Sequence, residues 1–189
     1  MKHTTDISQT LDYGLDTHNR VIFLDMVDSD SNVESGEVNH LVASRFLRSL
    51  HVLESLGRGN IRINLTSEGG CWTAGMVIYD AIMQSRCHTE IVVYGEASSM
   101  ASVILQAADT RSLMPNAILL LHDGQTKQEG VIRNVEKMVE HERKERLKMY
   151  QIYADRSGQP KKYFSRKLQG DWILTAEEAL EEGLADKIY

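Results

Sequence analysis

One stretch, from Glu90 to Ala108, constrains the possible folds of this chain more than any other. It begins with the β-branched and aromatic run Ile91–Tyr94, which is typical of a buried strand. It ends with Met100–Ala108, which is rich in helix-forming residues, has no proline or glycine, and so predicts a helix packed in the core. Between them lies a tight turn of small residues with two adjacent serines, Ser98 and Ser99.

A serine at such a strand-to-helix corner has two interpretations. Its hydroxyl is exposed in front of the free N–H groups and the positive dipole end of the helix, which is what a serine nucleophile and its oxyanion require. A Ser-Ser pair before an apolar helix is also an ordinary N-cap. The stretch alone favours the cap, and only the rest of the chain changes that balance.

The order of strand, small-residue turn and helix occurs twice. The strand Ile61–Leu65 runs into the turn Thr66–Gly70, and a helix is expected from about Cys71 to Ser85. A further apolar strand, Ala117–Leu121, ends on His122. Strands separated by helices predict a mostly parallel sheet and an α/β fold, in which ligands bind at the carboxyl ends of the strands. The two turns and His122 are therefore expected at one edge of the sheet.

The remaining elements follow from periodicity and turn signals. Ser35 is expected to cap a helix, because apolar residues recur at helical spacing from Val38 to Leu53. Thr175 is expected to cap the last helix, with Glu178 at the capping-box position. The other predicted elements are the strand Arg20–Leu24, the short basic helix Lys161–Leu168 and the strand Gly170–Leu174.

The segment Val131–Ala154 predicts a long helix that is amphipathic only at its two ends. Its middle, Glu140–Arg146, is charged on every face, and a helix that is polar all round does not lie on its own core. One interpretation is a solvated stretch with ion pairs along the helix. The apolar flanks favour the other, a helix that projects from the body and meets another subunit.

The composition limits the classes of function. The length of 189 residues suits one domain, residues 20–189, after a polar N-terminal arm at residues 1–19. A net charge of -6 argues against nucleic acid as the main partner. The arm does not resemble a secretory signal, and no apolar run is long enough to span a bilayer, so a cytoplasmic protein with reduced thiols at Cys71 and Cys87 is expected. The two cysteines lack metal-ligand spacing, and neither a metal nor a cofactor is expected.

Four motifs occur in a fixed order along the chain. Gly69-Gly70 follows one strand, Gly-Glu-Ala-Ser-Ser-Met follows the next, Leu-Leu-Leu-His follows a third, and Asp171 precedes Trp-Ile-Leu-Thr-Ala-Glu-Glu-Ala. With these motifs in this order, from Arg20 almost to the carboxyl end, the chain resembles ClpP, the proteolytic subunit of the ATP-dependent Clp proteases. The resemblance implies an α/β spiral of βαβ units, shared by ClpP and the crotonases, with the long helix projecting from it.

The resemblance also implies the residues of a catalytic site. The nucleophile would be Ser99, because the serine of the family pattern directly precedes methionine. His122 would be the general base, and Asp171 the carboxylate that fixes its tautomer. The oxyanion would be held by the backbone N–H groups of Gly69 and Met100.

Substrates and partners are implied in the same way. A peptide would pair as an added strand with Gly69, Gly70 and Cys71 on one side and with Asp123 and Gly124 on the other. The family assembles as two stacked seven-membered rings around a chamber, with the long helix between the rings, and a Clp-type AAA+ ATPase unfolds folded substrates. This chain has no phosphate-binding loop of its own. The expected activity is that of a serine endopeptidase that cleaves peptides and unfolded proteins in protein quality control.

Two departures from the family pattern keep alternatives open. Glu68 stands where a proline is usual, which adds a negative charge beside the oxyanion site, and Gly170 stands where members often carry an arginine that couples the rings. The full set of serine, histidine and aspartate counts against a non-catalytic or scaffolding ClpP-like subunit, but these two departures keep that alternative open. A crotonase-type enzyme acting on a CoA thioester shares the fold and the paired-amide oxyanion hole, but it does not need the serine, histidine and aspartate.

Overall fold

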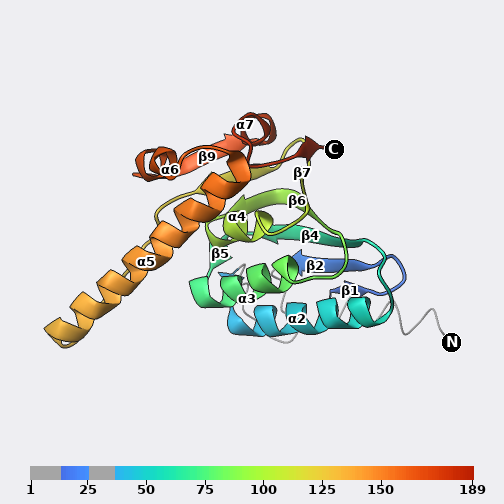
Figure 1. The fold of residues 1–189 in the computed structure, drawn as a ribbon, viewed down its shortest axis with the longest axis horizontal. Helices are drawn as coiled ribbons and strands as arrows, with labels where there is room; N and C mark the ends of the chain where they lie inside the picture. Colours follow the sequence, from blue (N-terminus) through green and yellow to red (C-terminus); the bar gives the residue numbers. More distant parts are fainter. Residues whose placement is uncertain (1–13, 26–36) are drawn as a thin grey trace.

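The protein is described here by a computed structural model, which covers residues 14–25 and 37–189 (Figure 1). The strands are β1 (Leu15–Asp16), β2 (Val21–Asp25), β3 (Glu37–Val38), β4 (Ile61–Ser67), β5 (Gly69–Gly70), β6 (Thr89–Ser98), β7 (Thr110–Leu113), β8 (Ile118–Leu121), β9 (Trp172–Thr175) and β10 (Lys187–Ile188). The helices are α2 (His40–Ser55), α3 (Trp72–Met83), α4 (Met100–Leu105), α5 (Ile132–Ser157), α6 (Lys161–Lys167) and α7 (Ala176–Glu181).

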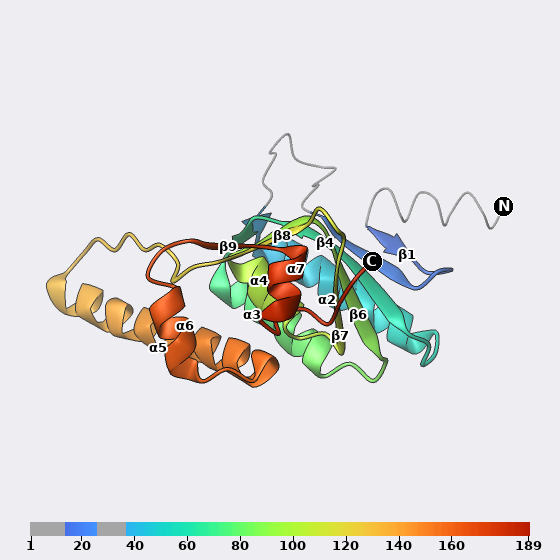
Figure 2. The same cartoon turned by 90° about the horizontal axis from the view of Figure 1, so that it is seen from above.

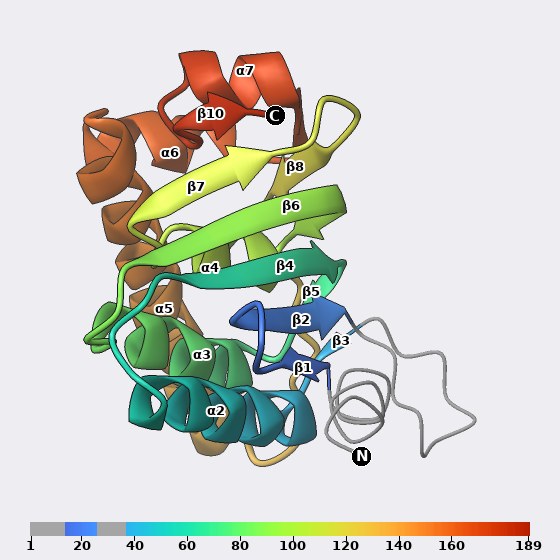
Figure 3. The ribbon, with the colours of Figure 1, turned by 90° about the vertical axis from the view of Figure 1, so that its right-hand side faces the viewer.

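The main sheet is mostly parallel, which confirms the predicted α/β class. Its strand order is β1-β2-β4-β6-β7-β10 (Figure 3), and β8 pairs with both β6 and β9. Only the β1–β2 and β8–β9 pairs are antiparallel among the described strands. The short strands β3 and β5 form a separate parallel pair. Parallel pairing brings the carboxyl ends of β4, β6 and β8 to one edge of the sheet.

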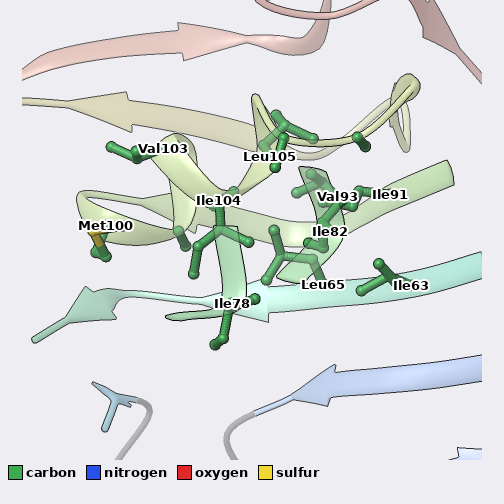
Figure 4. Packing of buried hydrophobic residues seen from close by; sticks show 14 of the residues in the cluster. Ile63, Leu65, Ile78, Ile82, Ile91, Val93, Met100, Val103, Ile104 and Leu105 are labelled. Carbon is green, nitrogen blue, oxygen red and sulfur yellow. The ribbon is translucent and has the colours of Figure 1, made fainter. Parts of the chain in front are cut away.

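The core lies between this sheet and helices α2, α3 and α4, which cover one face of it (Figure 2 and Figure 3). Alternate residues of β4 point into it, and Ile61, Ile63 and Leu65 are fully buried. Figure 4 shows side chains of α3, α4, β4 and β6 in contact around Ile104. Fully burying one such side chain is worth about 1.5–3 kcal/mol, so this layer fixes the position of α4 against β6.

Strand β6 corrects the prediction of a turn after Tyr94. The strand continues to Ser98, because β8 pairs in parallel with its second half, with Glu96 opposite Ile118 and Ser98 opposite Leu120. That pairing joins segments far apart in the sequence, and the small residues gave no local sign of it. Helix α4, predicted to reach Ala108, ends at Leu105.

The start of helix α2 also differs from the prediction. The helix begins at His40 and is capped by Asn39, whose side chain accepts a hydrogen bond from the Val42 N–H at 3.0 Å. Val38, predicted to lie on the helix, belongs to β3 instead. The predicted cap, Ser35, lies outside the described residues. The capping box at Thr175 is confirmed: the Glu178 N–H donates to the Thr175 hydroxyl, and the Thr175 N–H donates to the Glu178 carboxylate.

Helix α5 projects from the body, as predicted (Figure 1 and Figure 2). Its buried residues all lie between Met149 and Ala154, near its carboxyl end. Apolar side chains farther out are exposed, including Val131 at 68%, Ile132 at 76% and Val139 at 51%. The first two thirds of the helix therefore make little contact with the sheet of its own chain.

The ends of the domain add smaller elements. Of the predicted arm, residues 14–19 are described, and β1 pairs in antiparallel fashion with β2. Residues 1–13 of the arm lie outside the described residues. Strands β7 and β10, which the sequence did not predict, pair in parallel with each other. Among the described helices, none combines the length and the apolar character that crossing a membrane requires.

Candidate active site

Ser99 lies between the end of β6 and the start of α4, in a backbone conformation that non-glycine residues rarely adopt. Its φ is 52° and its ψ is -120°. Such backbone strain costs about 1–3 kcal/mol and occurs mainly where the surrounding structure holds it. Here the Ser99 N–H donates to the Leu120 carbonyl at 2.8 Å, and the Ser99 carbonyl accepts from the Ser102 N–H at 3.0 Å. The corner is therefore fixed on both sides.

The Ser99 hydroxyl is bonded to a histidine and not to the helix. The side chain makes no capping bond, although Ser99 occupies the N-cap position of α4. Its Oγ lies 2.7 Å from Nε2 of His122, at the end of β8. The parallel pairing of β6 with β8 places these two residues side by side. The simple cap interpretation is wrong for Ser99.

The two adjacent serines have different surroundings. Ser98 is 5% exposed, and its hydroxyl donates to Oε2 of Glu96 at 2.6 Å. Successive side chains of a strand point to opposite faces, so Ser98 and Glu96 share a face. Of the two serine hydroxyls, that of Ser99 is hydrogen-bonded to His122 and that of Ser98 to Glu96, and the assignment of Ser99 as the nucleophile stays a prediction.

Asp171 lies close to His122 but does not form the expected hydrogen bond. Strand β9 pairs in antiparallel fashion with β8, with Trp172 opposite Leu121, so Asp171 comes level with His122. Asp171 Oδ1 is 3.7 Å from His122 Nδ1, a distance at which charges attract but which exceeds hydrogen-bond length. The Asp171 side chain is 66% exposed and the His122 side chain 20%. The structure thus brings all three residues together, with the aspartate the most loosely held.

The Gly69 turn lies directly against Ser99 and the start of α4. Its φ is +98°, and a Cβ on Gly69 would come within 2.6 Å of the Ser99 Cβ and 2.8 Å of the Met100 nitrogen. Only glycine fits at this contact. The Gly69 N–H donates to the buried Ser67 hydroxyl at 2.9 Å, so this N–H already has an acceptor.

Three other backbone N–H groups lie close to this contact, those of Gly70, Cys71 and Met100. The Cys71 N–H donates to the Val38 carbonyl at 2.8 Å, on the β3 side of β5. The Gly70 N–H lies between the Gly69 N–H, which is bonded to Ser67, and the Cys71 N–H, which is bonded to Val38. The Met100 N–H lies in the first turn of α4, where helical N–H groups have no partner within the helix.

The remaining predicted substrate residues are Cys71, Asp123 and Gly124. Cys71 is exposed at the N-cap of α3, and hydrogen bonds from the Thr73 hydroxyl and the Ala74 N–H lower the pKa of its thiol. Gly124 has a φ of +84° and open space around it. Asp123 turns its carboxylate toward α5, where Tyr150 donates a hydrogen bond to it. The side chain of Asp123 is therefore bonded to α5.

Of the residues that distinguish the chain from the family pattern, neither disturbs the local fold. Glu68 is exposed, between β4 and β5. A Cβ added at Gly170 would meet no atom within 4 Å, so this position has room for a side chain.

The comparison with known families agrees with these observations. The model of the Clp protease family matches residues 16–189, which include the Ser99 corner, His122, Asp171 and the glycine turn. This chain belongs to the Clp protease family. Clp protease membership supports a ClpP-like peptidase and, in general terms, oligomeric assembly and an ATPase partner. It confirms the resemblance seen in the sequence motifs.

Sequence reasoning missed the hydrogen bonds that three side chains, Ser102, Tyr150 and Tyr153, make next to this site of the Clp protease chain. The sequence pattern places Tyr150 and Tyr153 at the apolar carboxyl end of the predicted long helix, and Ser102 within the predicted core helix Met100–Ala108. Each makes a hydrogen bond near Ser99 or His122: Tyr150 with Asp123, Tyr153 with Ser102, and Ser102 with the Ser99 carbonyl. Their spacing matches the inward face of a helix, and no sequence signal distinguishes a hydrogen-bonded tyrosine from one that only packs.

Proposed function

We propose that this chain is a serine endopeptidase subunit that cleaves peptides and unfolded proteins within an oligomeric chamber. The supporting observation is the 2.7 Å contact between Ser99 Oγ and His122 Nε2 at the shared edge of β6 and β8. A hydroxyl and an imidazole at this distance can exchange a proton directly. The Clp protease family match supports peptide hydrolysis as the reaction.

In the proposed mechanism, Ser99 Oγ attacks the carbonyl carbon of the scissile peptide bond while its proton passes to His122 Nε2. The resulting oxyanion is held by two backbone N–H groups, one of them that of Met100. Gly70 is the better candidate for the second, because the Gly69 N–H is already bonded to Ser67. Each such donor is worth about 2.7–4 kcal/mol of barrier.

The second half of the cycle returns the proton. His122 Nε2 donates its proton to the leaving amine, the C–N bond breaks, and an acyl ester remains on Ser99. A water molecule then attacks the ester carbon and gives a proton to the same nitrogen, and that proton passes to Ser99 Oγ as the ester C–O bond breaks and the carboxylic acid product leaves. Asp171 supports the imidazolium in both halves, and closing the 3.7 Å gap to His122 Nδ1 would complete the hydrogen bond.

Assembly and partner are parts of the same proposal. The exposed apolar residues of α5, among them Val131, Ile132 and Val139, suit a helix that packs between stacked rings. We take these rings to be homo-oligomeric and heptameric. A Clp-type AAA+ ATPase would supply the unfolding of folded substrates.

Cleavage of a short fluorogenic peptide tests the proposed function. The Ser99→Ala protein is expected to lose activity, whereas Ser98→Ala, which changes the neighbouring serine, keeps it. Light scattering on the same samples establishes that the compared particles have equal size. Wild-type rates from Ser99→Ala, in particles of that size, would refute the proposal.

A second candidate is a non-catalytic, scaffolding subunit. The exposed position of Asp171 and its 3.7 Å separation from His122 favour it. An assembled wild-type particle that neither cleaves the peptide nor reacts with a fluorophosphonate would establish it. The Ser99–His122 contact counts against a crotonase-type enzyme, which has no need of that pair.

A further inference from the structure

Two tyrosines lie one turn apart on the buried face of α5 and bond to the two segments that form the catalytic pair. Tyr150 is 4% exposed and Tyr153 is fully buried. Burial raises the pKa of both phenols, so each remains a protonated hydrogen-bond donor at neutral pH.

Tyr153 is linked to the nucleophile through one intervening side chain. Its hydroxyl oxygen lies 2.7 Å from Ser102 Oγ, and Ser102 Oγ donates to the Ser99 carbonyl at 2.6 Å. Since the single hydroxyl proton of Ser102 is used on Ser99, Tyr153 must be the donor to Ser102. The chain of bonds thus runs from Tyr153 through Ser102 to the backbone carbonyl of Ser99, and Ser102 is itself fully buried.

Tyr150 is linked to the base in a parallel way. Its hydroxyl donates to Oδ1 of Asp123, the residue that directly follows His122. The other carboxylate oxygen, Oδ2, lies 3.7 Å from a guanidinium nitrogen of Arg146, one turn earlier on α5. Two side chains of α5 therefore hold the carboxylate of Asp123, the residue next to His122 in the chain.

We propose that Tyr150 and Tyr153 are positioning residues, which together set the distance between Ser99 and His122 from a common helix. The inference rests on the proposed function. A buried tyrosine hydroxyl needs only one hydrogen-bond acceptor, and acceptors in many parts of a fold would satisfy it. Here the two acceptors adjoin the two partners of the 2.7 Å contact, so a rigid α5 fixes both ends of that contact.

The test removes single oxygen atoms and follows the reactivity of Ser99. Tyr150→Phe and Tyr153→Phe keep both rings in place. Ser102→Ala breaks the link to Ser99 and leaves both tyrosines intact. Tyr189→Phe is the matched control, because its hydroxyl donates to the Glu90 carboxylate at 3.0 Å, at the start of β6 and not at its end.

Each assembled protein is treated with a small fluorophosphonate, and intact mass gives both the rate constant of labelling and its end-point. A small phosphonate does not need the peptide-binding strands, so its rate reports Ser99–His122 geometry. We expect Tyr150→Phe, Tyr153→Phe and Ser102→Ala to lower this rate constant, and kcat for a peptide, by at least about tenfold. The labelling end-point and KM are expected to stay at wild-type values, and Tyr189→Phe to match wild type in every measurement.

Several outcomes contradict the inference and are distinguishable. Wild-type rate constants in both tyrosine variants overturn the positioning role while the proposed function stands. A lower end-point with an unchanged rate constant shows partial unfolding, which also overturns it, because the tyrosines then only stabilise the fold. A wild-type particle that does not label at all ends the proposed function, and the inference with it.

Discussion

Replacing Gly69 with alanine is expected to abolish the proposed peptidase activity by displacing Ser99. The added Cβ would lie 2.6 Å from both the Ser98 carbonyl oxygen and the Ser99 Cβ, about 0.8 Å short of ordinary contact. All three nearest atoms belong to the strained corner or to the first residue of α4, and two of them are backbone. The clash can be relieved only by moving the β5 turn and the corner apart.

Two terms set the magnitude of this effect. A side chain at a φ of +98° costs about 1–3 kcal/mol of stability. A displacement of about 1 Å at a catalytic group costs about a hundredfold in rate. We therefore expect kcat/KM for a peptide to fall at least about a hundredfold. The free energy of unfolding is expected to fall by about 1–3 kcal/mol.

The matched control is Gly57→Ala. Gly57 has a φ of +136°, but a Cβ there would meet no atom within 4 Å. It is expected to lose stability through backbone strain alone and to keep wild-type activity. Activity is measured by peptide cleavage, and stability by urea unfolding monitored by circular dichroism. A Gly69→Ala protein with kcat/KM within tenfold of wild type would refute the reasoning.

Three further predictions concern the base, the core and an ion pair. His122→Ala is expected to lower kcat by about 10³–10⁴-fold, and Asp171→Asn by less because that carboxylate is exposed and 3.7 Å away; equal losses in steady-state assays would contradict this. Ile104→Ala is expected to lower the free energy of unfolding by about 2–5 kcal/mol in urea titrations, because it empties a fully buried site; a loss under 1 kcal/mol would contradict it. Burial opposes ionisation of Asp186, but the hydrogen bonds from Arg111 outweigh it and hold the pKa of that carboxyl below its ordinary value of 3.8. The pair therefore stabilises the fold fully above about pH 4 and loses that effect as the pH falls through the lowered pKa, so the stability gap between wild type and Asp186→Asn should narrow in acid and not in base.

Much of the fold could be predicted because local patterns and global pairing agree. Apolar runs broken by small-residue turns indicated parallel strands, and the carboxyl-end rule indicated where Ser99 and His122 would meet. The extension of β6 to Ser98 was missed, because it depends on pairing with β8, which follows α4 and β7 in the chain. The cap at Asn39 was missed because Val38, the residue directly before it, fits the helical spacing but ends the short strand β3.

For the candidate site, too, one part could be predicted from the sequence and another could not. Motif order identified the side chains, and the structure brings them together. The contacts that control their geometry were beyond sequence reasoning: the Ser67 hydroxyl on the Gly69 N–H, and the tyrosine hydroxyls on Ser102 and Asp123. These bonds depend on the approach of α5 and β5 to α4 and β8, which no local pattern encodes. The catalytic roles of the residues stay predictions.

Peptide mapping after fluorophosphonate treatment of the assembled particle tests the central claim most directly. The account predicts one adduct per chain, located on Ser99, with no adduct in Ser99→Ala and full labelling in Ser98→Ala. An adduct on any other residue, or an unlabelled Ser99 beside His122 in a particle of full size, would contradict it.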